Sequence, residues 1–262
     1  MLEFLDALPL WALGALTVGA CVLFGIAASA FTHRVGWTLH PDDIDSGTVL
    51  HALVGLIYAV VLGLIVVNVQ GDHDAVRQST IAEAGALSDI HDALEGLATE
   101  PRDRLRAHVR RYLEVVVADE WPALREGRTS PAAERELHAL STGIVTLRTQ
   151  SADAPALHRT LLEELDAASD ARRNRVFVGS RGINRATWIV VILGAMISVG
   201  FAALFPIRGR GRAIMVTLAA SILGLMLFLV VATSRPLRGQ LGVGPDAFVE
   251  LATTLEARRD AP

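Results

Sequence analysis

Two uncharged stretches in the C-terminal half of the chain decide its fold: 186–205 (ATWIVVILGAMISVGFAALF) and 213–232 (AIMVTLAASILGLMLFLVVA). Each has about 20 residues, the length that an α-helix needs to cross the hydrocarbon core of a bilayer. The linker 206–212 (PIRGRGR) ends both apolar runs with arginines, and its glycines allow the chain to reverse. Because this linker is short, the two helices must be antiparallel neighbours. The stretch therefore predicts a transmembrane helical hairpin.

A second apolar pair near the N-terminus repeats this pattern. Pro9–Phe31 and Val49–Val69 are long enough to span, and a short acidic loop separates them. The alternative for the first run is a cleaved signal peptide, because Ala28-Ser29-Ala30 has the form of a cleavage site. The residues before the run are acidic and the run is long, which favours a membrane span. The sequence predicts a second hairpin.

Composition agrees with a membrane protein. The 262 residues are 52% hydrophobic and have a mean hydropathy of +0.41, which is more apolar than an average soluble domain. The formal net charge of -4 argues against a nucleic-acid partner. All the basic residues are arginine, as in proteins from GC-rich bacterial genomes, and the single cysteine, Cys21, excludes a disulfide within the chain.

The polar insert between the hairpins shows helical periodicity throughout. Apolar residues recur at spacings of three and four along its first helix, which continues the second span, with Gly71 as the expected hinge. Thr99–Pro101 opens a second helix that Trp121-Pro122 closes, Ser130-Pro131 caps a third, and a fourth starts near Pro155. We therefore predict an all-α protein: four transmembrane helices in two hairpins with an inserted, water-facing four-helix bundle. The expected regions are the N-terminal hairpin (1–70), the bundle (71–184), the C-terminal hairpin (185–233) and a polar tail (234–262) that ends in a short helical segment, Pro245–Arg259.

No enzyme signature is found. The sequence has no P-loop, dinucleotide-binding glycine pattern, nucleophile elbow or HExxH motif. His91 and Glu95 share a helix face, but a solvated face explains them better than a metal site. We expect no catalytic residue, no cofactor and no metal.

Glu83 is the notable polar residue of the insert. It lies on the apolar stripe of its helix, where a carboxylate must be paired or shift its pKa toward neutrality. The candidate partners on neighbouring helices are Arg110, Arg111, Arg172 and Arg175. Glu83 is interpreted either as an ion pair that fixes the register of the bundle or as a gate just outside the membrane.

Polar and small residues in the spans suggest where a pore or an interface could form. Four polar residues could line a pore or its mouths, or could instead bond neighbouring helices: Asn68, Gln70, Thr217 and Ser221. Two rows of small residues allow close helix packing, within one chain or between subunits: Gly55, Ala59 and Gly63, and Gly194, Ser198 and Ala202.

Several motifs together resemble the bacterial bestrophin-like family, also known as domain of unknown function 4239, over nearly the whole chain. In and after the second span, the resemblance is carried by Gly55–Tyr58, Leu62-Gly63 and Glu83–Leu87. Later in the chain it is carried by Tyr112-Leu113, Glu120-Trp121, Asn184–Trp188, Arg235-Pro236, Gly239, Val243 and Pro245. Ser234 and Leu237 depart from the family pattern, which has an acid and an aromatic residue there. The resemblance implies kinship with bestrophins, which are oligomeric anion channels, but no bestrophin pore residue can be matched here.

The resulting hypothesis is a multi-pass protein of a bacterial plasma membrane that forms a homo-oligomeric ion channel or pore for small anions. The spans carry no charge of the kind that ion-coupled transporters place at mid-membrane, which argues against a transporter and is compatible with a pore. The second span is the expected lining helix. The alternative is a non-conducting sensor or scaffold whose bundle binds a partner or ligand. An arginine count weakly favours placing the bundle and both termini in the cytoplasm.

Overall fold

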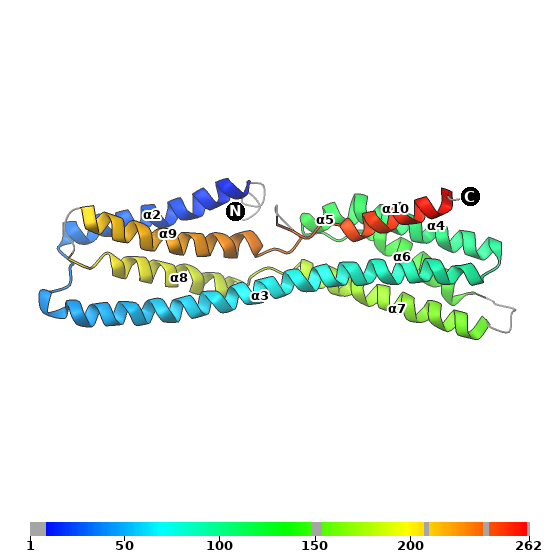
Figure 1. Ribbon diagram of the computed structural model, residues 1–262, viewed down its shortest axis with the longest axis horizontal. Helices are drawn as coiled ribbons and strands as arrows, with labels where there is room; N and C mark the ends of the chain where they lie inside the picture. The colour runs from blue at the N-terminus through cyan, green and yellow to red at the C-terminus, as the bar shows by residue number, and fades with distance from the viewer. Residues whose placement is uncertain (1–8, 148–153, 207–209, 238–240, 261–262) are drawn as a thin grey trace. The chain divides into compact units, whose positions relative to one another are not determined.

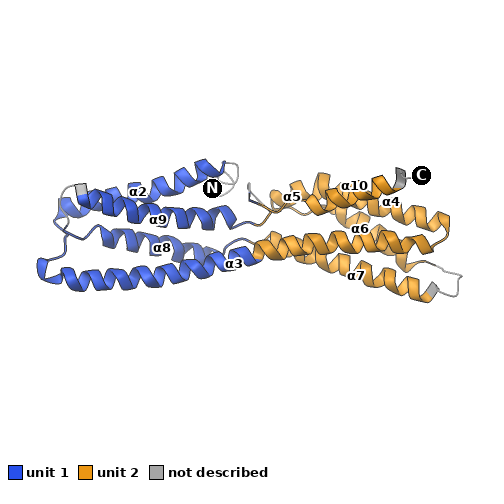
Figure 2. Ribbon diagram, in the orientation of Figure 1, with its two compact units in different colours: residues 1–71, 182–235, 239–241 blue, residues 72–181, 236–238, 242–262 orange. Residues whose placement is uncertain are grey.

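The computed structural model describes residues 9–147, 154–206, 210–237 and 241–260, and every secondary-structure element within these ranges is a helix (Figure 1). The chain divides into two compact units (Figure 2). Unit 1 comprises residues 1–71, 182–235 and 239–241, and unit 2 comprises residues 72–181, 236–238 and 242–262. The predicted all-α architecture is confirmed.

Unit 1 holds the membrane-spanning helices. Four helices are long and apolar enough to cross a membrane, which confirms the four predicted spans. They are α2 (Leu10–Val35), the first part of α3 (Ile44–Ala93), α8 (Arg185–Ala202) and α9 (Arg210–Thr233). The 3-10 turn η1 (Pro41–Asp43) precedes α3, and the Asn184 side chain caps α8 by accepting from the Thr187 N–H at 2.7 Å.

Close packing in unit 1 joins helices that are distant in sequence. α2 lies along α9, where a Cβ added at Gly224 would stand 2.7 Å from the Cα of Val18. α8 packs against α3, where the Tyr58 hydroxyl donates to the Val191 carbonyl at 2.6 Å. At one end of this pair, the His51 ring stacks on Phe201 with ring centroids 5.2 Å apart. Since His51 begins its span and Phe201 ends its own, α3 and α8 run antiparallel.

α3 continues from the membrane span into the bundle as one helix of 50 residues. This confirms that the first bundle helix extends the second span. The helix does not end at Gly71, the position expected to act as a hinge.

Unit 2 is a helical bundle with a contiguous apolar core. Besides the end of α3 and the 3-10 turn η2 (Leu94–Gly96), it contains α4 (Thr99–Val115), α6 (Pro131–Val145) and α7 (Ala154–Gly179). The Ser130 hydroxyl caps α6 by accepting from two backbone N–H groups at 3.2 Å, as predicted. Leucine, isoleucine and valine side chains from all these helices are fully buried in the core.

The second bundle helix differs from the prediction, because Trp121-Pro122 does not end it. A π-helical stretch, η3 (Val116–Glu120), leads directly into α5 (Trp121–Arg125). The backbone N–H of Trp121 donates to the carbonyl of Val116, five residues back. Pro122, which has no backbone N–H, is tolerated because it lies in the first turn of α5. The helical path therefore runs on to Arg125.

The C-terminal segment was predicted to be a polar tail with a short helix at Pro245–Arg259; that helix forms, but it packs into the core of unit 2. α10 (Asp246–Asp260) buries Phe248, Leu251 and Leu255 in the core. Before it, the Val243 N–H donates to the Pro236 carbonyl at 2.7 Å, and Leu237 packs against Gly179 of α7. The bundle core is thus built from five segments of the chain.

Candidate functional site

Glu83 lies at the centre of a buried group of charged side chains in unit 2. Glu83 and Arg175 are both 0% exposed. The Arg175 guanidinium donates to both carboxylate oxygens of Glu83, at 2.8 and 3.1 Å, and the Tyr112 hydroxyl donates to the same carboxylate at 2.5 Å. The predicted need for a partner is therefore met by Arg175, one of the four arginines proposed from the sequence.

A second carboxylate completes the group. Glu120, at the end of the π-helical stretch, is fully buried and accepts from Arg175 at 2.7 Å. Arg172, one turn before Arg175 on α7, donates to the other oxygen of Glu120 at 2.6 and 3.2 Å. Two carboxylates face two guanidinium groups, so the charges balance within the core. We call Glu83, Tyr112, Glu120, Arg172 and Arg175 the buried charge cluster.

Aromatic rings enclose this cluster. The guanidinium carbon of Arg175 lies 4.9 Å from the Trp121 ring centroid and 5.3 Å from that of Phe248, distances typical of cation–π contacts. The two rings meet edge to face at 5.8 Å, and the Trp121 indole N–H donates to the Val243 carbonyl at 3.2 Å. Segments distant in sequence, from α5 and from the start of the C-terminal region, therefore close around one arginine.

The electrostatics of the cluster follow from its burial. Burial raises the pKa of Glu83, and the charge and hydrogen bonds of Arg175 and the hydrogen bond of Tyr112 oppose that rise. Burial alone would lower the pKa of Arg175, but Glu83 and Glu120 raise it above the usual range, so the guanidinium stays charged. Burial and Glu83 raise the pKa of Tyr112, which keeps its hydroxyl protonated as a donor. The cluster is thus a fixed set of charges, suited to setting the register of the bundle.

The four polar pore candidates do not form one group. Asn68 and Gln70 are exposed near the end of the span on α3, whereas Thr217 and Ser221 are half-buried in the first half of α9. α3 and α9 both run antiparallel to α8, so Asn68 and Gln70 lie at one end of unit 1, whereas Thr217 lies toward the other end and Ser221 lies midway. Their roles stay a prediction.

The residues that carried the family resemblance fall mainly into two clusters. Glu83, Tyr112 and Glu120 belong to the buried charge cluster, Trp121 contacts its Arg175, and Val243 accepts a hydrogen bond from Trp121. Trp188 packs against the small apolar cluster of unit 1 around Tyr58, and Pro236 is buried in unit 2. Arg235 is half-buried, and Gly239 lies outside the described residues. Motifs about 160 residues apart along the chain therefore meet in one place.

The two rows of small residues have different surroundings. A Cβ at Gly194 would come within 2.3 Å of the Tyr58 ring, so this glycine is needed for packing within the chain. Cβ atoms added at Gly55 and Gly63 would meet nothing within 4 Å. The row on α8 is thus explained by intrachain packing, whereas the row on α3 is uncovered.

Sequence reasoning did not find Glu120 as the second carboxylate or Phe248 as a wall of the cluster. Helical periodicity through residues 116–120 assumes 3.6 residues per turn, and the π-helical stretch breaks that assumption. Phe248 lies in the helix predicted at the end of the polar tail, and it is the one aromatic residue of that tail, a signal that could have marked it.

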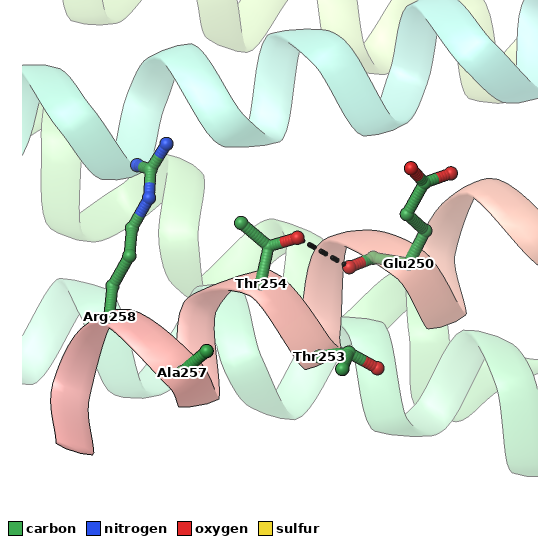
Figure 3. Close-up of a pocket in the computed structure, with 5 residues that line it drawn as sticks. All are labelled: Glu250, Thr253, Thr254, Ala257 and Arg258. Carbon is green, nitrogen blue, oxygen red and sulfur yellow. Dashed lines mark hydrogen bonds between the residues drawn. The ribbon is translucent and has the colours of Figure 1, made fainter. Parts of the chain in front are cut away.

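Unit 2 also has an open hollow over α10, of about 560 Å³ (Figure 3). Its described lining comes from α10 alone: Glu250, Thr253, Thr254, Ala257 and Arg258. Thr254 donates to the Glu250 backbone carbonyl, and Arg258 pairs with Asp92 of α3 at 2.7 Å. These side chains are engaged within the unit and do not converge on a reacting group. Among the described residues, no set of three or more His, Cys, Asp or Glu side chains is placed to hold a metal ion.

Comparison with known proteins identifies the fold. Residues 42–248 match the family model of the Bestrophin-like domain. A crystal structure of a bacterial Bestrophin homologue from Klebsiella pneumoniae with a point mutation superimposes with a TM-score of 0.69 at 13% identity, covering 95% of this chain and 99% of that one. A crystal structure of a membrane protein variant superimposes with a TM-score of 0.64 at 14% identity, covering 95% and 99%. At these identities the likeness shows a shared fold. No curated protein matches the sequence.

Proposed function

The chain belongs to the Bestrophin-like family, and from this we propose that it is an ion channel of the membrane that works as a homo-oligomer. The resemblance to bestrophins, which are oligomeric anion channels, suggests small anions as the permeating species. The conduction path would be lined by α3.

One observation carries this proposal: a complete face of α3 is uncovered along the membrane. Apolar side chains at helical spacing on this face are 51–71% exposed: Val49, Leu53, Leu56, Val60, Leu64 and Val67. Four apolar helices cannot enclose a water-filled path by themselves. A ring of copies would place this face of α3 around a common axis, where it would form a hydrophobic constriction that gates by dewetting.

The proposal predicts that a polar side chain on this face promotes conduction. Val60→Ser puts a hydroxyl at the constriction, so we expect a larger current than for the wild type, because a wetted path conducts more readily. The measurement is current across planar bilayers that contain the purified full chain, with asymmetric chloride salts. Ile192→Ser on α8 is the matched control, because Ile192 is also exposed and lies on another helix.

Stepwise currents whose reversal potential follows chloride would support an anion channel. A strictly monomeric protein would contradict the proposal. So would silence of both the wild type and the Val60→Ser variant while each is folded and oligomeric.

We further propose that the bundle and both termini face the cytoplasm of a bacterium. Four spans put them on one side, and the raw count of arginines close to the spans is higher there. A fluorescent protein that matures only in the cytoplasm, fused after Pro262, should fluoresce; a dark but intact fusion would reverse the assignment.

A second candidate function is a non-conducting sensor or scaffold that binds a partner through unit 2. The hollow over α10 favours it, because the exposed residues Thr253 and Thr254 line the hollow and the exposed Val249 lies one turn before Thr253 on the same helix. Affinity purification of the full chain from its native membrane, with a Thr253→Arg variant as control, tests it. A partner lost in that variant would support the sensor, and an identical set of proteins in both samples would argue against it.

A further inference from the structure

A groove runs along the membrane-spanning part of unit 1 between α3, α8 and α9. Its volume is about 440 Å³. Gly55, Ala59 and Gly63 form its α3 side, and Ile222 and Met226 line its α9 side. The α3 side of the groove adjoins the uncovered face described above, because Gly63 lies about 60° and Gly55 about 140° around the helix from Val60.

The groove has the dimensions of one extended hydrocarbon chain. Along α3 it reaches from His51 to Val66, which is about 22 Å at 1.5 Å per residue. One leaflet of a bilayer is about 15 Å of hydrocarbon, so the groove exceeds that depth. Its volume spread over this length leaves a mean cross-section of roughly 20 Å², far less than the cross-section of an α-helix 10–12 Å across. The groove therefore accommodates a single chain or side chains and not a whole helix.

Polar groups without partners lie at one end of this apolar groove. Ser198 is 6% exposed, and its hydroxyl has no hydrogen-bond partner among the described residues. The same holds for Nδ1 of His51, whose ring stacks on Phe201 and meets Phe205 edge to face. Both residues line the groove. His51 lies in the second turn of α3 and Ser198 lies in the last turns of α8, so both are near the membrane surface that holds the short loops.

A buried hydroxyl left unpaired is unfavourable and requires an explanation. Polar groups at the surface end and apolar walls below them match an amphiphile with a hydrogen-bonding head and an alkyl tail. We infer that this groove is a phospholipid site that takes one acyl chain, with a head-region oxygen of the lipid hydrogen-bonded to Ser198 and His51. The inference does not depend on ion conduction.

Photo-crosslinking tests the site on the full chain. The protein is reconstituted in vesicles of phosphatidylethanolamine and phosphatidylglycerol that contain phosphatidylglycerol with a diazirine in one acyl chain. Labelled residues are mapped by mass spectrometry. We expect enriched labelling of residues 55–63 of α3 and 222–226 of α9 over the exposed surface of α2, which ordinary bulk lipid bathes.

Filling the groove should remove that enrichment. In Gly55→Leu and Gly63→Leu the new side chain projects into the groove, where a Cβ meets nothing within 4 Å. Leucine is also a better helix former than glycine, so the variants should fold, which thermal melting verifies. Gly19→Leu on α2 is the matched control, because its Cβ also meets nothing within 4 Å and it does not line the groove.

Labelling of the groove that is lost in Gly63→Leu and kept in Gly19→Leu supports the site. Ser198→Ala should then weaken retention of the lipid during delipidation, measured by native mass spectrometry. Uniform labelling that no groove variant changes would overturn the inference and leave the groove as a surface bathed in bulk lipid. Absence of label from the wild-type groove, with dissociation of the oligomer in Gly63→Leu, would overturn it in favour of a second copy.

Discussion

Unit 2 completes its own core, whereas unit 1 leaves much of its apolar surface uncovered. The bundle buries large side chains from five segments and balances four charges inside. In the spans, only 11–22% of the residues in each apolar window are buried. The bundle therefore follows the rules of a water-soluble domain, and the spans depend on lipid or on further copies of the chain for the rest of their packing.

This contrast shows where specificity resides in the molecule. Hydrophobic burial drives the bundle together, and the cluster around Arg175 then restricts how its helices can be aligned, because a misaligned helix would leave a charge unpaired. In the spans, alignment depends on steric fit at few positions, such as the Tyr58 ring over Gly194.

The largest expected effect is the loss of the central cation. Arg175→Met removes the common partner of Glu83 and Glu120 and leaves the buried Glu83 carboxylate without a cation, while Glu120 keeps Arg172. We expect a loss of about 3–5 kcal/mol in the free energy of unfolding, as for other buried pairs that lose one member. Thermal and denaturant unfolding followed by circular dichroism measures it.

Arg173→Met is the control for that variant, because Arg173 is exposed and pairs only with Asp170 on the same helix. It should leave the unfolding midpoint unchanged. Equal midpoints for Arg175→Met and the wild type would show that the cluster does not support the bundle.

The next largest effect is a loss of stability at a closely packed glycine of unit 1, compared with a glycine that has no near neighbour. Gly194→Leu places a Cβ 2.3 Å from the Tyr58 ring, so Tyr58 must move and its hydrogen bond to Val191 is lost. Overpacking of this kind is destabilising by about 1–3 kcal/mol. Thermal unfolding in detergent should show a lower midpoint for Gly194→Leu than for Gly63→Leu, and equal midpoints would contradict the packing described for α3 and α8.

The smallest effect concerns the pH dependence of unit 2. Burial, and then Arg106, lower the pKa of His91 below its ordinary 6.5, although Asp92 opposes this. The unfolded chain therefore takes up a proton near pH 6.5 that the folded chain resists. The stability that depends on neutral His91 is complete above pH 6.5 and is lost as the pH falls toward the folded-state pKa.

His91→Gln should flatten this decline between about pH 7.5 and 5.5. Unfolding midpoints of both proteins over that range provide the measurement. Parallel pH profiles would indicate that another group carries the acid sensitivity.

The sequence was sufficient for features that depend on local periodicity. Spans of about 20 uncharged residues, the cap at Ser130 and the burial of Glu83 all follow from composition and spacing along one helix. The choice of Arg175 over the other three arginines could not be predicted, because it depends on how α7 is rotated against α3. The closure of the cluster by Phe248 is a contact between distant segments, which periodicity cannot reveal.

For unit 1, too, the sequence predicted the helices but not which of their faces are packed against one another. The pattern identified two rows of small residues but could not show that Gly194 is covered by Tyr58 while Gly63 is open. That distinction depends on which helices are neighbours, and α2 packs along α9, a helix that is remote in sequence.

The π-helical stretch at Val116–Glu120 has a consequence for how the chain tolerates changes in length. A π-turn holds one residue more than an α-turn, so η3 can be regarded as a one-residue insertion accommodated without breaking the helix. In a regular α-helix, Tyr112 and Trp121 would point about 180° apart, whereas the extra residue of the π-turn reduces this angle to about 80°. Deleting one residue there would therefore restore regular α-helix and leave Trp121 facing Arg175. A deletion within η3 should be tolerated better than a deletion in the regular turns of α4, which would rotate Trp121 by about 100° relative to the turns before it.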